Sequence, residues 1–128
     1  MVKGKFAIGN WNDMAFQPGR EGVKRAMLGI DMDNMLVMIN VLQPGHEIAP
    51  EHSHADEQMS ILLSGELDYY TDGEPHRMTA GSWIAVGSGV GHRTEVVGDK
   101  ECVLMDIFAP TRPKFVESYK AFLGEQSE

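Results

Sequence analysis

The chain has 128 residues, enough for one domain with a buried core, and its 42% hydrophobic and 23% charged residues are ordinary for a folded globular protein. Its formal net charge is −8 with no cluster of Lys and Arg, which excludes the basic face that nucleic acid binding requires. The N-terminus lacks the apolar core of a signal peptide and no run approaches the roughly 20 apolar residues of a membrane helix, so we expect a cytoplasmic protein with no membrane partner.

Residues 1–22 show no regular periodicity and are expected to form an N-terminal arm. Phe6, Ile8 and Trp11 are its apolar residues, and they predict either an edge strand or an arm lying on the barrel. The segment 17–22, QPGREG, is expected to be a turn. Arms of this kind often pack on a second subunit, so the sequence favours a homodimer.

From residue 23 to residue 108, short apolar or alternating segments are separated by Gly, Asp and Asn turns. The Asp72-Gly73 pair is a strong signal for a two-residue hairpin turn. This spacing predicts an all-β sandwich or barrel. The strands that we expect, besides one in the segment 51–65, are Val23–Ile30, Met35–Leu42, Leu67–Thr71, Pro75–Thr79, Ser82–Val86, His92–Val97 and Glu101–Phe108.

The last of these strands carries one acidic residue among apolar ones. Asp106 and Phe108 share parity with Cys102 and Leu104, so all four are predicted to face inward. An inward carboxylate is costly unless it is paired or near a metal. Two interpretations stay open from the residues alone: Asp106 forms a structural ion pair with Arg112, or Asp106 is catalytic.

A short amphipathic helix is predicted after Pro113, over residues 113–124. Phe115, Tyr119, Phe122 and Leu123 form its apolar stripe, and Gly124 is expected to end it. The stripe is expected to pack on the outer sheet or on a partner subunit.

A candidate metal site lies in the segment EHSHADEQMSILLSG, residues 51–65. His52, His54 and Gln58 share the parity of one strand face, and His92 follows in a second glycine-rich segment. A lone His-x-His pair arises often by chance, and a single His is usually structural. If the four residues meet, however, imidazole nitrogens and an amide oxygen would suit Zn, Fe or Ni, and such a site usually keeps positions open for substrate.

The spacing of these residues resembles the two motifs of the cupin superfamily. The first runs from Gly45 through the histidines and Gln58 to Gly65, and the second runs from Gly81 to His92. The resemblance covers about residues 23–112 and implies a cupin jelly-roll barrel or sandwich. The sequence departs from most cupins in having Gln58 where a glutamate is usual, which lowers the negative charge of the site and favours an anionic small-molecule substrate.

Within the cupins, the chain resembles the single-domain KdgF family of pectin degradation. The shared segments are GVKR at residues 22–25, HSHxxEQ at 52–58 and DxFxPxR at 106–112, and the glutamine at position 58 is itself a feature of that family. The resemblance implies a divalent transition metal, Zn, Fe, Ni or Mn, held by His52, His54, Gln58 and His92. It also implies that Asp106, Phe108 and Arg112 surround the substrate.

The reaction implied by this resemblance is the linearisation of a 4,5-unsaturated uronate to a 5-keto-4-deoxyuronate. The alternatives are another metal-dependent cupin enzyme, such as a dioxygenase or a polyketide cyclase, and a non-catalytic cupin that binds a small ligand. Five further polar residues near these motifs are expected to be solvated rather than in the site. They are His46, Glu57, His76, Arg77 and Arg93.

Overall fold

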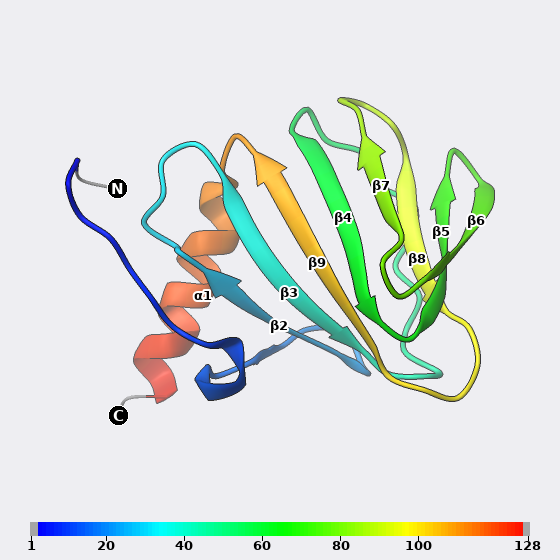
Figure 1. The fold of residues 1–128 in the computed structure, drawn as a ribbon, viewed down its shortest axis with the longest axis horizontal. Helices are drawn as coiled ribbons and strands as arrows, with labels where there is room; N and C mark the ends of the chain where they lie inside the picture. Colours follow the sequence, from blue (N-terminus) through cyan, green and yellow to red (C-terminus); the bar gives the residue numbers. More distant parts are fainter. Residues whose placement is uncertain (1–2, 127–128) are drawn as a thin grey trace.

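The computed structural model describes residues 3–126 and contains two antiparallel sheets and one C-terminal α-helix (Figure 1). The large sheet has the strand order β1-β2-β3-β9-β4-β7, and the small sheet has the order β6-β5-β8. Neighbours in the large sheet that are distant in sequence, such as β3 and β9, show that the chain crosses over as expected for a jelly roll. The prediction of an all-β fold with a short C-terminal helix is confirmed.

The observed strands lie close to those predicted. Their bounds are β1 Gln17–Pro18, β2 Val23–Leu28, β3 Leu36–Leu42, β4 Glu57–Ser64, β5 Glu66–Thr71, β6 Glu74–Thr79, β7 Trp83–Val86, β8 His92–Val96 and β9 Cys102–Ala109. The prediction that residues 17–22 are only a turn was wrong, because Gln17 and Pro18 pair with Arg25 and Lys24 of β2. Trp11–Asp13 forms a short 3-10 helix, whereas Phe6 and Ile8 lie in an arm and are 84% and 92% exposed.

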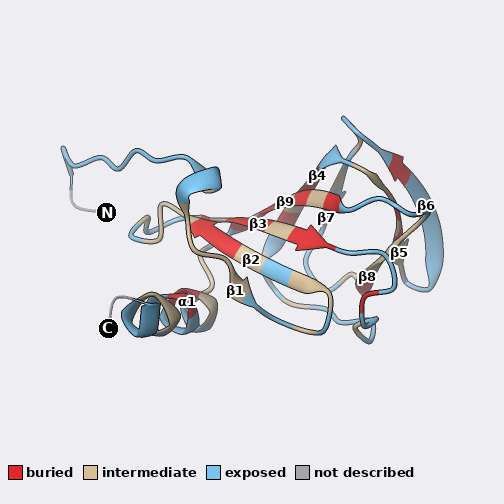
Figure 2. Cartoon of the chain, turned by 90° about the horizontal axis from the view of Figure 1, so that it is seen from below, coloured by how far each residue is buried: buried red, intermediate tan, exposed pale blue. Residues whose placement is uncertain are grey.

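The hydrophobic core has two parts. The first lies between the sheets and includes Leu62, Leu67, Tyr69 and Leu104. The second joins β2 and β3 to the helix α1, Pro113–Gln126, through Met27, Leu36, Val116 and Tyr119. Figure 2 shows this arrangement as buried stretches along β2, β3 and β9, with α1 beside β2. None of the helices within residues 3–126 is long and apolar enough to cross a membrane.

The helix α1 begins at Pro113 as predicted but continues beyond Gly124 to Gln126. Gly124 is not among the glycines with a left-handed backbone, the conformation that ends a helix at a glycine. The prediction that Gly124 stops the helix was therefore wrong. The hairpin turn at Asp72-Gly73 is confirmed, with both residues at positive φ (47° and 83°) as a type I′ turn requires.

Candidate metal centre

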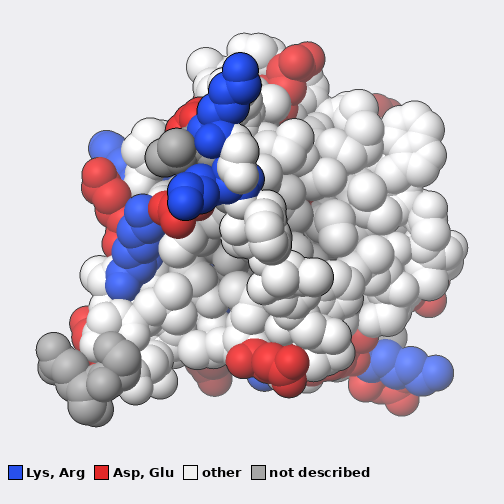
Figure 3. Space-filling view, turned by 60° about the vertical axis from the view of Figure 1, so that its left-hand side comes forward, with Lys and Arg blue, Asp and Glu red and all other residues white. Residues whose placement is uncertain are grey.

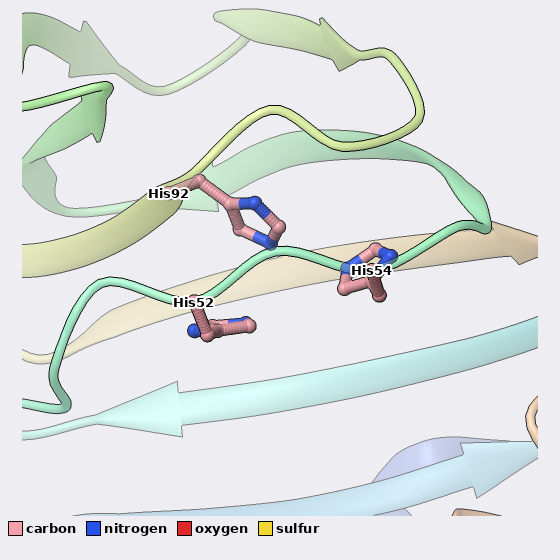
Figure 4. A group of neighbouring side chains, drawn as sticks. All are labelled: His52, His54 and His92. Carbon is pink, nitrogen blue, oxygen red and sulfur yellow. The ribbon is translucent and has the colours of Figure 1, made fainter.

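The side chains of three histidines, His52, His54 and His92, lie close together (Figure 4). His52 and His54 come from the irregular segment before β4, and His92 is the first residue of β8. One ring nitrogen of each lies within 4.8 Å of those of the other two. His92 is buried, His54 half-buried and His52 exposed, so the group forms the wall of an open cavity rather than a closed core.

The backbone holds two of these histidines together directly. The amide of His52 donates to the carbonyl of His92 at 3.1 Å, and the amide of His92 donates to the carbonyl of His52 at 2.8 Å. This is an isolated bridge, and regular strand β4 begins only at Glu57. The prediction that one strand carries His52, His54 and Gln58 was therefore wrong, although the three side chains do meet.

Backbone carbonyls fix the orientation of the rings. Nδ1 of His54 donates to the carbonyl of Asp56 and Nδ1 of His92 donates to that of Val90, both at 2.9 Å. Each neutral ring then presents Nε2 as a lone pair, which is the arrangement typical of a metal ligand. Within the described residues, Nε2 of His92 is buried with no hydrogen-bond partner. Burial lowers the pKa of His52 and His92, which favours the neutral, ligating form.

Gln58 lies beside the histidines with its two amide atoms pointing to different groups. Its Oε1 is 3.1 Å from Nε2 of His54, so two lone-pair atoms face one another, and a shared cation would satisfy both. Its Nε2 donates to Oδ1 of Asp106 at 3.1 Å, and also to Ser60 and Tyr69. The buried, unpartnered His92 nitrogen and this pair of lone pairs show that the four residues fit a cation with nitrogen and oxygen ligands.

Asp106 lies on β9 at the centre of a buried network of neutral hydrogen-bond donors. Its Oδ1 accepts from Oγ of Ser60 at 2.5 Å and from Gln58, and its Oδ2 accepts from Nδ2 of Asn40 at 2.7 Å. The hydroxyl of Tyr69 completes the network at 3.1 Å from Ser60. Burial raises the pKa of Asp106 to about 6, and these hydrogen bonds limit the rise.

Arg112 does not form the structural ion pair with Asp106 that was one of the two open interpretations. Its Nε lies 3.2 Å from Oδ2 of Asp56, and its guanidinium lies over the rings of Phe108 and Phe115. Asp106 and Phe108 face inward as predicted, and both are buried. These residues, with His52, Gln58 and His92, line a cavity of about 170 Å³.

Three residues of the site were not singled out from the sequence: Asn40, Ser60 and Tyr69. Asn40 and Ser60 each lie between apolar neighbours on their strands, which was the signal that could have identified them, whereas Tyr69 lies in the polar strand ELDYYT and had no such signal. Among the residues expected to be solvated, Glu57, His76 and Arg77 are exposed as expected. Two of those expectations were wrong: Arg93 lines the cavity, and His46 is 5% exposed. The His46 ring bonds to the carbonyl of Glu47 and the amide of Val96, a structural role.

A family model for the cupin domain matches residues 38–108. Solved structures show the same fold. An RmlC-like cupin from Shewanella frigidimarina NCIMB 400 is 25% identical with a TM-score of 0.77, and the match covers 87% of this chain and 96% of the other. KdgF from Halomonas sp. is 16% identical with a TM-score of 0.73 and coverages of 81% and 94%.

A third similar structure is the polyketide cyclase RemF from Streptomyces resistomycificus, 18% identical with a TM-score of 0.69 and coverages of 83% and 80%. No curated protein sequence matches the chain. At identities of 16% and 18%, the similarity to KdgF and RemF shows a shared fold. The geometry of the site described above comes from the structure of this chain alone.

Proposed function

The chain belongs to the cupin family, and from that premise we propose that it is a metal-dependent enzyme that opens the ring of a 4,5-unsaturated uronate. The observation that carries the proposal is the continuous line of contacts from the histidines through Gln58 to Asp106. It supports a function in which a metal held by the histidines and a proton carried by Asp106 act on one ligand. The fold likeness to KdgF and the shared HSHxxEQ and DxFxPxR segments support the choice of substrate.

The metal would be held by His52, His54, Gln58 and His92, and Zn, Fe, Ni and Mn all accept such ligands. A bound divalent ion supplies Lewis acidity, which stabilises negative charge developing on a substrate oxygen. The four side chains are neutral, so none of that positive charge is cancelled by the protein ligands themselves.

Asp106 is proposed as the general acid and base. A pKa of about 6 lies near the neutral range in which a carboxylate can both take up and release a proton. Hydrogen bonds from Asn40 and Ser60 hold the carboxylate in one orientation. The group is therefore buried, positioned and able to change its protonation state.

Arg112 is proposed to bind the carboxylate of the uronate. A planar guanidinium matches a carboxylate through paired hydrogen bonds, and Asp56 holds the Arg112 side chain through Nε. Phe108, which lies under Arg112, forms the apolar wall of the cavity beside the reacting ring.

The proposed reaction is an isomerisation, so the unsaturated uronate and its product have the same composition. The C1 hydroxyl of the sugar loses its proton to Asp106, the bond between C1 and the ring oxygen breaks, and C1 becomes an aldehyde. The ring oxygen leaves as the enolate of C5, and C4 then takes the proton back from Asp106. The product is the linear 5-keto-4-deoxyuronate, with no oxidant or water consumed.

The test is to mix protein of known metal content with unsaturated galacturonate and follow loss of the conjugated double bond by ultraviolet absorbance. We expect accelerated loss that a chelator abolishes and that proceeds without O₂ uptake. Asp106→Asn should keep the fold and the metal yet slow turnover by about 10²–10⁴-fold. A metal-loaded protein that leaves the sugar untouched, or an Asn variant with a normal rate, contradicts the proposal.

The second candidate is another metal-dependent cupin enzyme acting on an apolar small molecule, a dioxygenase or a polyketide cyclase. It is favoured by the apolar side of the cavity, formed by Met38, Leu104, Phe108 and Phe115, and by the fold likeness to RemF. Consumption of O₂ with an aromatic substrate would identify a dioxygenase. Ring closure of a polyketide without O₂ would identify a cyclase.

A further inference from the structure

The arginines of this chain are concentrated in one place. The sequence has five arginines and six lysines, and four of the arginines but none of the lysines line the cavity of the metal centre. Asp106 is the sole acidic side chain lining it among the described residues. In a chain with a net charge of −8, the cavity is thus a local concentration of positive charge. The four arginines are Arg20, Arg25, Arg93 and Arg112.

Two of these guanidinium groups already have carboxylate neighbours: Arg112 has Asp56 at 3.2 Å, and Arg93 has Glu95 at 3.6 Å. Arg20 and Arg25 differ. Nε of Arg20 donates to the backbone carbonyl of Glu47 at 3.2 Å, and Nε of Arg25 donates to Oε1 of Gln17 at 3.3 Å. Both acceptors are neutral, and within residues 3–126 no carboxylate lies within ion-pair distance of either arginine.

These contacts engage Nε of three of the arginines and leave their terminal Nη groups open to the cavity. Arg20, Arg25 and Arg112 are each held through Nε, so their terminal Nη groups are available for a ligand. Arg25 and Arg112 both lie on the ring of Phe115, with guanidinium carbons 4.9 and 4.2 Å from its centroid. The two guanidinium carbons are therefore at most about 9 Å apart. Burial and the nearby charges of Arg112 and Arg20 lower the pKa of Arg25, a repulsion that a bound anion would relieve.

The register of the large sheet places Arg25 relative to the reacting groups. Arg25 is directly opposite Asn40 on the next strand, and the Asn40 amide donates to Asp106. On β9 the residue in line with Asn40 is Leu104, two positions before Asp106, so the backbone of Arg25 lies about 12 Å from that of Asp106, two strand spacings across and two residues along. A ligand whose reacting end is at Asp106 and the histidines would thus extend its far end toward Arg25 and Arg20.

We propose that Arg20 and Arg25 form a second anion subsite, beside that of Arg112, and that the natural substrate carries two acidic groups. One group is bound at Arg112 near the metal centre, and the other is bound by Arg20 and Arg25. The second group is a carboxylate or a phosphate, since a guanidinium fork pairs with either. This inference rests on the proposed function only in taking the Arg112 end as the reactive one. An unsaturated uronate carries one carboxylate, so the inference requires that the natural substrate carry a second acidic group in addition to it.

Binding of small acids tests the subsite without any turnover. Isothermal titration of the zinc-loaded full-length protein would compare glutarate, a diacid, with pentanoate, the monoacid of the same chain length, at fixed ionic strength. We expect glutarate to bind at least about tenfold more tightly, as one extra charge-assisted interaction predicts. In Arg25→Gln the preference should fall below about threefold. Phosphoglycolate, in a parallel titration, would show whether phosphate is accepted in place of a carboxylate.

The matched control is Arg77→Gln. Arg77 is the one arginine outside the cavity and pairs with Asp68 and Glu66 on the small sheet, so its loss should leave the preference for glutarate unchanged. Repeating the titrations on metal-free protein removes any contribution of zinc to binding of the acids. Arg25→Lys keeps the positive charge but loses the planar pair of N–H donors, so it should retain part of the preference for glutarate. A retained preference would show that the site is still folded in the variant.

Equal affinity for the two acids in the wild-type protein would overturn the proposal, as would a preference that survives Arg25→Gln. A protein that shows the arginine-dependent preference but does not open the unsaturated uronate would reject the ring-opening reaction and leave the second subsite standing. A protein that turns over the uronate without preferring glutarate would reject the subsite alone.

Discussion

At the scale of single residues, the two contacts of the Gln58 side chain explain why an amide stands here where most cupins have a glutamate. Oε1 faces the histidines, while Nε2 donates to the carboxylate of Asp106. A glutamate could serve the metal but has no hydrogen to donate at neutral pH. It would instead place a second negative charge next to Asp106, so the amide lets a ligand and a buried carboxylate be neighbours.

Gln58→Glu should therefore separate metal binding from catalysis. We expect the variant to bind metal at least as tightly, because the ligand gains a charge, but to lose about 10–100-fold in turnover because Asp106 is no longer hydrogen-bonded in the same way. Metal titration and steady-state rates measure the two effects. A variant with weaker metal binding and unchanged turnover would show that Gln58 does not connect the two groups.

The raised pKa of Asp106 predicts a pH dependence of stability in the metal-free protein. The folded state keeps its proton up to about pH 6, whereas the unfolded chain releases it near an ordinary value of about 3.9. The folded state thus binds more protons between these values, and wild-type stability falls relative to Asp106→Asn as the pH rises from about 4 to about 6. The relative change is on the order of 2–3 kcal/mol.

Urea unfolding of the two proteins across this pH range gives the difference directly. Any loss of hydrogen bonds in the Asn variant adds an offset that does not change with pH, so the slope isolates the ionisation of Asp106. A flat difference would mean that the carboxylate has an ordinary pKa and is charged throughout the range.

The sequence identified the residues that meet at the candidate metal centre but not the residues that hydrogen-bond to Asp106 beside it. Two histidines two positions apart and a later His92 form a pattern that stands out in one dimension. Asn40 and Ser60 are polar residues between apolar chain neighbours, and their role depends on which strands become neighbours of β9. That order follows from the crossovers of the whole chain, which no local pattern specifies.

At the scale of elements, the segment before β4 was expected to be a strand and is not, yet the three side chains that the strand was expected to bring together do meet. Alternation in a strand was the reason to expect His52, His54 and Gln58 on one side, yet residues 53–56 form no strand. The residues meet because the bridge between His52 and His92 anchors one end of the segment and β4 anchors the other. Strand bounds elsewhere were predictable to within about two residues, because Gly and Asp turns mark them.

Substitution by alanine should destabilise the protein much more at Gly65, in the turn between β4 and β5, than at Gly73, in the turn between β5 and β6. Gly65 and Gly73 both have positive φ, 89° and 83°, so alanine is strained at either position. A Cβ at Gly65 would lie 2.6 Å from Sγ of Cys102 and 2.7 Å from the carbonyl oxygen of Glu101, whereas Gly73 has open space. We expect Gly73→Ala to cost about 1 kcal/mol of unfolding free energy.

Gly65→Ala should cost about 1–3 kcal/mol more than that, since backbone and a buried thiol must shift as well. Chemical denaturation of both variants measures the comparison. Equal losses would show that β9 moves away from the turn at little cost.

At the scale of the whole molecule, the outer face of the large sheet is apolar where it meets solvent. Met105, Ile61 and Trp83 lie in one row across three strands, and Trp83 is 67% exposed, whereas Ile39, the next residue of the row, is fully buried. Exposed apolar area of this kind marks an interaction surface. Figure 3, which brings the side of the N-terminal segment forward, shows charged side chains along its margins and a broad uncharged area between them.

We propose that this face, with the apolar arm of Phe6 and Ile8, binds a second copy of the chain. Trp83→Glu would place like charges against one another across a twofold interface, and it should weaken the dimer by at least about 30-fold. Light scattering after size exclusion, over a range of concentrations, measures the change, and Thr79→Glu, at an exposed neutral position on the small sheet, is the control for one added negative charge. A wild-type protein that stays monomeric would contradict the homodimer.

Charge at this scale could not be predicted from composition. A net charge of −8 favours no anionic ligand, yet folding gathers four arginines from three separate parts of the chain around one cavity. Arg20 precedes β2, Arg25 lies within it, Arg93 lies on β8 and Arg112 follows β9. The spacing of these arginines in the sequence does not group them, and Arg93 was expected to be solvated.

The paired backbone hydrogen bonds between His52 and His92 have a consequence for how a metal enters the protein. The conformational entropy of bringing together two ligands 40 positions apart in the chain is lost when the backbone folds, before any ion arrives. Metal uptake should then leave the secondary structure unchanged, because the backbone bridge is already formed and backbone carbonyls already orient the rings of His54 and His92. Such a preformed site selects among ions by their preferred coordination geometry, so the identity of the resident metal is a property of the folded backbone as much as of the four side chains.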